Sequence, residues 1–94
     1  MIAAGRYASA LMGLANEKNK LDAVRNDMQT VKKVYDENHE FMLFIKSPVI
    51  KTDKKLSVIE SIFKGKVEDI TLSFLKLITS KRRESYIREI AVAF

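Results

Sequence analysis

The stretch "LDAVRNDMQTVKKVYDEN", residues 21–38, decides the fold class because its apolar residues recur at helical spacing. They lie three or four positions apart, as residues on one face of an α-helix do; they are Leu21, Val24, Met28, Val31 and Tyr35. The chain has no alternating run of β-branched or aromatic residues bounded by turn residues, so no strand is expected. The pattern predicts a helix over residues 20–37 and an all-α protein.

Helical spacing continues on both sides of this stretch. Upstream, residues 3–18 predict a first helix, and the break before the second helix is expected at Asn19 or Lys20. Downstream, residues 38–46 predict a short apolar helix. It must end before the proline at position 48, because the residue before a proline is disfavoured in the α region. The side chains of this helix expected to face the interior are Phe41, Phe44 and Ile45.

A fourth helix is predicted from Thr52 or Asp53, either of which can act as its N-cap, to about residue 64. Gly65 is well placed to end it in the left-handed conformation. The expected apolar face is Leu56, Ile59, Ile62 and Phe63.

The remaining sequence predicts a fifth helix over about residues 67–80 and a sixth over about residues 83–93. Helices joined by short loops, with no sheet to cover, must bury their apolar faces against one another. We therefore expect residues 1–94 to form a single domain, a compact six-helix bundle.

Composition narrows the possible functions without selecting one. The chain has no cysteine, which excludes disulfides and thiolate chemistry, and no apolar run approaches the roughly 20 residues of a membrane span. The opening residues lack the pattern of a signal peptide. The net charge of +5 is uneven, since residues 51–94 carry ten basic against six acidic residues. A basic half is compatible with a nucleic-acid, a membrane-surface or an acidic protein partner, but most often reflects a solvated surface.

No catalytic or metal-binding pattern is present. His39 is the only histidine, has no cysteine or second histidine to share a metal with, and is interpreted as a surface or capping residue. Gly65 and Lys66 lack the remaining residues of a phosphate-binding loop. We therefore expect no enzymatic activity and no cofactor.

The densest basic cluster is Lys81, Arg82 and Arg83, at the junction of the fifth and sixth helices. Basic residues near a helix C-terminus meet the negative end of its dipole, which gives this cluster a structural role. The alternative is a basic helical nucleic-acid-binding domain. It would need base-reaching or stacking residues beside the cluster, whereas the phenylalanines fall on apolar stripes.

The first predicted helix is unusually rich in small residues. In "GRYASALMGLA", residues 5–15, six of eleven residues are Gly, Ala or Ser, yet the apolar arc on the helical wheel is wider than one packed face requires. One interpretation is a shallow groove for a partner helix, with Ser9, Ala10 and Gly13 as its floor and Tyr7 and Leu14 as its walls. The other is a central helix crowded on all sides. Periodicity alone leaves both open. On the fifth helix, Leu77 lies at the edge of the apolar arc beside Ser73 and Ser80.

Four segments in sequence point to a known family: "RYASAL", "LDAVRNDMQTVKKVYDEN", "FIKSPVI…KK…IESIF" and "TLSFLKLITSKRRESYIREIAVAF". In this order they resemble the N-terminal domain of the delta subunit of F-type ATP synthase, whose mitochondrial relative is the oligomycin-sensitivity-conferring protein. The resemblance covers all 94 residues. It rests on the ordered set of segments rather than on any single motif.

The resemblance implies a non-catalytic stator joint that links the catalytic head to the peripheral stalk during proton-driven ATP synthesis. Helices one and five would hold the N-terminal amphipathic helix of an alpha subunit. By the same resemblance, we expect the family's C-terminal domain, which contacts the b subunits of the peripheral stalk, to be absent from this chain. The expected location is peripheral, on the cytoplasmic side of a bacterial inner membrane, with no nucleic-acid contact and no direct membrane insertion.

The resemblance also carries residues over by position. Tyr7 matches the family's groove tyrosine, with Ala10 one turn on, and Leu77 is its counterpart on helix five, with Ser73 and Lys76 alongside. Together with the residues from helix geometry, the expected partner-binding groove is Tyr7, Ala10, Gly13, Leu14, Ser73, Lys76, Leu77 and Ser80. Many bacterial members have a glycine before the arginine that closes helix five. Here that pair is Arg82-Arg83, which makes the local turn uncertain.

Overall fold

The computed structural model describes residues 2–94, with the side chains of residues 2 and 3 left undescribed, and Met1 lies outside the described residues. Within that range the chain is an all-α bundle, as predicted. Its elements are α1 (Ile2–Glu17), α2 (Leu21–Glu37), α3 (His39–Lys46), α4 (Thr52–Phe63), α5 (Asp69–Ser80), the 3₁₀ turn η1 (Glu84–Tyr86) and α6 (Ile87–Ala93).

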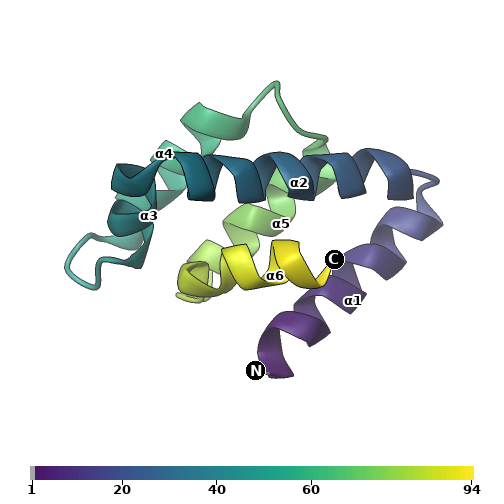
Figure 1. Cartoon of the computed structure of the whole chain (residues 1–94), viewed down its shortest axis with the longest axis horizontal. Helices are drawn as coiled ribbons and strands as arrows, with labels where there is room; N and C mark the ends of the chain where they lie inside the picture. The colour runs from purple at the N-terminus through teal and green to yellow at the C-terminus, as the bar shows by residue number, and fades with distance from the viewer. Residues whose placement is uncertain (1) are drawn as a thin grey trace.

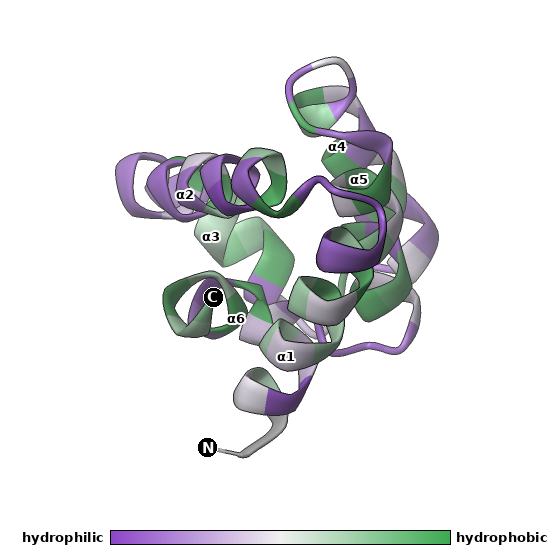
Figure 2. Cartoon of the chain, turned by 90° about the vertical axis from the view of Figure 1, so that its right-hand side faces the viewer, coloured by the Kyte–Doolittle hydropathy of each residue, from purple (hydrophilic) through white to green (hydrophobic). Residues whose placement is uncertain are grey.

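The helices form two groups that share α2. In Figure 1, α2 and α6 lie side by side, α1 crosses near the end of α6, and α4 and α5 lie behind α2. α1 packs against α6 and α2, whereas α5 packs against α4, α2 and η1. Figure 2 shows that α2 is largely hydrophilic along its length, whereas α5 is more hydrophobic. α1 and α5 therefore belong to different groups, and each keeps one side away from the other helices.

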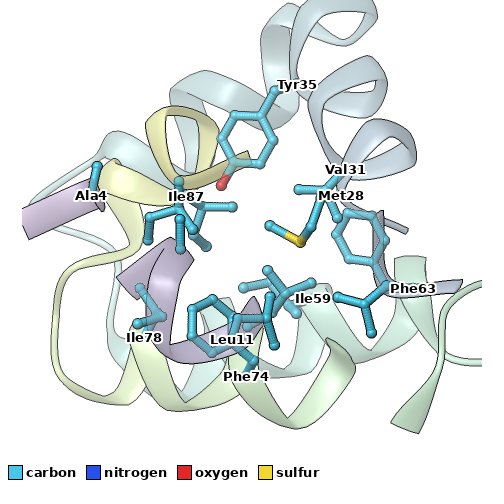
Figure 3. Close-up of a cluster of buried hydrophobic side chains, with 14 of the residues drawn as sticks. Ala4, Leu11, Met28, Val31, Tyr35, Ile59, Phe63, Phe74, Ile78 and Ile87 are labelled. Atoms are coloured by element: carbon cyan, nitrogen blue, oxygen red, sulfur yellow. The ribbon is translucent and has the colours of Figure 1, made fainter. Parts of the chain in front are cut away.

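The core is built from the stripes that the spacing predicts. Figure 3 shows Leu11 of α1, Met28 of α2 and Ile59 of α4 pointing toward one another, and each is at most 1% exposed. Tyr35 and Phe41 meet edge to face with ring centroids 5.0 Å apart, and Phe41 meets Phe63 at 6.2 Å. Aromatic pairs favour this arrangement because the positive ring edge meets the negative ring face. Burial raises the pKa of the Tyr35 hydroxyl above its ordinary value.

Two of the predicted helix ends are confirmed. Asn19 has φ +56°, and the N–H of Lys20 donates to the Ala15 carbonyl at 2.8 Å, so the chain breaks where expected. Gly65 has φ +83°, and the N–H of Lys66 donates to the Phe63 carbonyl at 2.9 Å. Glycine reaches this conformation without the steric clash of a Cβ atom.

Other predicted ends are wrong. Neither Thr52 nor Asp53 caps α4: both lie inside the helix, and Lys51 occupies the N-cap position without a side-chain hydrogen bond. α5 begins at Asp69, later than residue 67, because Glu68 is extended at φ −63° and ψ +153°. The predicted sixth helix begins as the 3₁₀ turn η1 before α6 continues it.

The interior also holds an ion pair that helical spacing does not reveal. Lys55 of α4 is 3% exposed and Glu84 of η1 is 9% exposed, with Nζ and Oε2 2.5 Å apart. Lys55 lies on the same face of α4 as Ile59 and Phe63, so the spacing places it on the buried side, but nothing in the sequence names its partner 29 positions away. A buried charge is tolerated when an opposite charge meets it, and this pair joins α4 to the turn that follows α5.

Candidate functional site

The two faces of α1 have different surroundings. Its inner face is buried against the bundle and consists of Ala4, Ala8, Leu11 and Ala15. Its outer face is exposed at Ala10, Gly13 and Leu14, and Tyr7 is half-buried between the two. The helix is therefore not crowded on all sides. Small buried residues let α1 approach its neighbours closely, and the small exposed residues leave the outer face flat.

A groove of about 570 Å³ lies between α5 and the C-terminal end of α1 with the turn that follows it. Its apolar lining includes two leucines that are unusually exposed, Leu14 at 42% and Leu77 at 50%. Charged residues line one end, where the α1–α2 turn meets the start of α5. The full lining is Leu14, Lys18, Lys20, Glu68, Asp69, Ile70, Ser73, Phe74 and Leu77.

The structure brings together part of the predicted site. Leu14, Ser73 and Leu77 line the groove from opposite helices. Ala10, Gly13 and Ser80 are exposed on the same two helices but outside the lining, as is the half-buried Tyr7. The Ser80 hydroxyl donates to the Leu77 carbonyl at 2.8 Å.

Lys76 is a predicted site residue that does not line the groove. Its ammonium lies 2.7 Å from the Glu60 carboxylate of α4, at the flank of the surface that Ser73 and Leu77 line. This hydrogen bond lowers the pKa of the Glu60 carboxyl below its ordinary value. Lys76 therefore joins α5 to α4 rather than lining the groove.

α1 and α5 run in opposite directions along the groove. At one end, Lys20 pairs with Glu68 at 3.0 Å, near the start of α5. At the other end, the guanidinium of Arg83 donates to the Tyr7 hydroxyl and lies 5.9 Å from the centre of its ring. The basic cluster thus follows α5 as predicted, with Lys81 at the C-cap, but Arg83 also contacts α1. Helix-dipole reasoning did not include that contact.

Arg82 occupies the turn that the sequence left uncertain. It has φ +62°, and the N–H of Arg83 donates to the Ile78 carbonyl at 3.0 Å, closing α5 in a Schellman-type turn. Glycine is the usual residue at this position because it has no Cβ atom to clash. An arginine stands here instead, and the turn keeps the same geometry.

Asp27 of α2 holds the start of α5 from behind the groove. Its Oδ2 accepts the backbone N–H of Glu68 at 2.8 Å and the Thr71 hydroxyl at 2.7 Å. Glu68 is the N-cap of α5, and its backbone N–H has no acceptor within that helix. The Asp27 side chain, from another helix, supplies the acceptor. Sequence reasoning missed Asp27 because its partners are more than 40 positions away. The available signal was its place beside Val31 and Val34 on the helical wheel, which puts a carboxylate on the buried side of α2.

Across residues 2–94, no group of three or more histidine, cysteine, aspartate or glutamate side chains is arranged to hold a metal ion. None of the helices in the described part of the chain is both long and apolar enough to cross a bilayer.

The chain is similar to known proteins over almost its whole length. Residues 3–94 match the family model described as ATP synthase delta (OSCP) subunit. ATP synthase subunit delta of Cytophaga hutchinsonii is 41% identical over 89 residues, covering 95% of this chain and 49% of the relative. That of Chlorobaculum tepidum is 39% identical over 93 residues, covering 99% and 51%. The chain thus spans about half the length of these relatives.

A solved structure has the same fold. A chain in the cryo-EM structure of the Toxoplasma gondii mitochondrial ATP synthase hexamer superposes with a TM-score of 0.91 at 32% identity. The match covers 100% of this chain and 53% of that chain.

Proposed function

The chain belongs to the ATP synthase delta (OSCP) subunit family, and from that premise we propose that it is a non-catalytic joint in the stator of an F-type ATP synthase. In this role it links the catalytic head to the peripheral stalk during proton-driven ATP synthesis. It needs no cofactor and is peripheral, on the cytoplasmic side of a bacterial inner membrane. Contact with the b subunits belongs, in this proposal, to the family's C-terminal domain.

The partner proposed for the groove is the N-terminal amphipathic helix of an alpha subunit. The observation that carries this proposal is the pair of exposed leucines, Leu14 and Leu77, facing one groove from two helices. A helix that laid its apolar face between them would cover both. A few buried anchors usually dominate the affinity of such an interface.

The extent of the groove also supports this partner. Ser73 in the lining is small enough to let a second backbone approach α5, and the neighbouring Phe74 supplies apolar surface. Ala10 and Gly13 continue the flat surface along α1 beyond the groove, toward Tyr7. The proposed contact surface is therefore the groove lining together with Tyr7, Ala10, Gly13 and Ser80, with Lys76 at its flank.

A stator joint has to resist torque rather than perform chemistry. The rotating central stalk drives catalysis in the head and pushes the head round with it, so the head must be held relative to the membrane sector. Tight and stiff attachment meets this need. The fold offers it because both walls of the groove are anchored: α1 is packed on α6 and α2, and the start of α5 is tied to Asp27.

The nucleic-acid alternative has no support from the relatives or from the structural neighbour. The basic cluster has a different use in the structure, because Lys81 and Arg82 form the turn after α5 and Arg83 contacts Tyr7.

Titration of the ¹⁵N-labelled 94-residue chain with a synthetic peptide of the alpha-subunit N-terminus tests the proposal by NMR. We expect saturable shifts concentrated in α1 and α5, around Leu14 and Leu77, that persist at high salt. A peptide with its apolar face replaced by serine is the control and should not bind. Absence of binding, or shifts centred on α3, would contradict the proposal. Binding of duplex DNA with a steep salt dependence would favour the nucleic-acid alternative instead.

A further inference from the structure

Charge is distributed unevenly along the two helices that form the groove. Residues 2–16 and 70–83 contain no aspartate or glutamate. Of their exposed cations, Arg83 contacts Tyr7, Arg6 precedes Tyr7 in the sequence and Lys81 is the C-cap of α5, whereas Arg82 lines a separate hollow with Lys55 and Glu84. The opposite end is mixed, with Lys18 and Lys20 beside Glu68 and Asp69, two of which form an ion pair. One end of the groove is therefore strongly positive and the other nearly balanced.

Arg83 is the cation at the positive end that the fold holds in place. Its guanidinium lies over the Tyr7 ring, 5.9 Å from the centroid, and donates one hydrogen bond to the Tyr7 hydroxyl. The side chain is otherwise exposed, and no aspartate or glutamate of residues 2–94 forms a salt bridge with it. A guanidinium has five N–H donors in a planar fork, so most of them remain available.

We propose that Arg83, held on Tyr7, is a carboxylate-binding position that places one acidic side chain of the docked helix at this end of the groove. The proposal rests on the proposed function, because it assumes that an amphipathic helix occupies the groove. It specifies the chemistry of that helix: an apolar stripe for Leu14 and Leu77, and an aspartate or glutamate that meets Arg83.

The proposal is supported by the geometry of a guanidinium–carboxylate pair and by the positive potential around Arg83. A carboxylate pairs with a guanidinium through two parallel hydrogen bonds, and a guanidinium already fixed in orientation loses less freedom on pairing. The exposed cations Arg6, beside Tyr7 in the sequence, and Lys81, at the C-cap of α5, strengthen the positive potential there and repel a basic residue. The apolar groove then supplies most of the affinity, and the charged end sets which way the helix lies.

A double-mutant cycle tests the proposal with the alpha-subunit N-terminal peptide as the probe. The chain variants are Arg83→Gln and, as the matched control, Lys81→Gln, which removes the same charge but has no contact with Tyr7. The peptide variants replace each aspartate or glutamate by its amide, one at a time. Calorimetry at physiological salt gives the dissociation constants, and circular dichroism confirms that each chain variant is folded.

We expect Arg83→Gln to weaken binding about tenfold or more, and Lys81→Gln less than threefold. One peptide variant should show the same loss, and combining it with Arg83→Gln should cause no further loss. Arg83→Lys should recover only part of the affinity, because an ammonium lacks the planar fork.

Three results would overturn the proposal. If Arg83→Gln binds like the wild type, the end of the groove takes no carboxylate, although the groove itself remains the binding site. If Arg83→Gln and Lys81→Gln lose affinity equally, and no single acidic residue of the peptide matters, the basic residues act only through their summed electrostatic potential and not through a specific pair. If the unmodified peptide does not bind the wild-type chain, the proposed function fails, and this inference fails with it.

Discussion

The two faces of α1 are made of similarly small residues but have different surroundings. Ala4, Ala8 and Ala15 are at most 5% exposed and pack α1 against the bundle. Ala10 and Gly13 are exposed and continue the surface of the groove. Small residues occur on both faces, so residue size cannot distinguish a face that packs inside the bundle from a face that binds a partner. What distinguishes the two faces is whether another helix already covers them.

The largest expected effect is on the covered face. Ala8→Asp would place a carboxylate where the native side chain is 3% exposed and packed in the apolar core. Burying an unpaired charge is among the most destabilising changes known, so we expect a loss of at least about 4 kcal/mol in the free energy of unfolding. Urea denaturation followed by circular dichroism measures it. Stability within about 1 kcal/mol of wild type would show that this face is open as well.

The second largest expected effect is on α5, which forms the other wall of the groove. Asp27→Ala removes the acceptor for the Glu68 N–H and the Thr71 hydroxyl, and we expect a loss of about 2 kcal/mol. Amide hydrogen exchange should increase first at the start of α5. Asp22→Ala is the control on the same helix, because its carboxylate is 96% exposed and should contribute less than about 0.5 kcal/mol. Equal losses in the two variants would mean that Asp27 does not act through α5.

Ala10→Asp is the counterpart of Ala8→Asp on the open face. Its carboxylate can remain in water in the free chain, so the free energy of unfolding should change by less than about 1 kcal/mol. A docked helix would have to desolvate it, so affinity for the alpha-subunit peptide should fall about tenfold or more. If Ala10→Asp destabilised the chain as severely as Ala8→Asp, both faces of α1 would be part of the core. Full-strength binding by a stable variant would place the groove elsewhere.

The smallest expected effect is at Arg82, a residue that is exposed but that we do not expect to bind the partner helix. Arg82 is exposed, yet its backbone has φ +62°, which costs an L-residue about 1–2 kcal/mol. Arg82→Gly relieves that cost but increases the freedom of the unfolded chain, so we expect a net stabilisation of about 0.5–1 kcal/mol. Thermal unfolding should show a higher midpoint, and peptide affinity should stay within threefold. A lower midpoint would show that the Arg82 side chain contributes to the fold.

Much of this outcome could be predicted from the sequence. The apolar stripe from Val24 to Tyr35 predicts α2 because helix periodicity is a property of one segment. The exposure of Leu14 and Leu77 follows from the same wheel geometry, since both fall at the margins of their apolar arcs. The family resemblance came from the order of segments along the chain, which also needs no coordinates. Helix ends were less certain: Lys51 rather than Thr52 is the N-cap of α4, and Arg82 takes a turn conformation usual for glycine.

The sequence by itself therefore determined the all-α class, the helices, the inner faces and the family, because each depends on patterns within short segments. Only the tertiary structure decided which polar residues meet. Asp27 reaches Glu68 across 41 positions, Lys55 reaches Glu84 across 29, and Arg83 reaches Tyr7 across 76. Periodicity along one helix says which side a residue faces but not which side of another helix it meets. Those pairings depend on how all the helices pack together, and they position both walls of the groove.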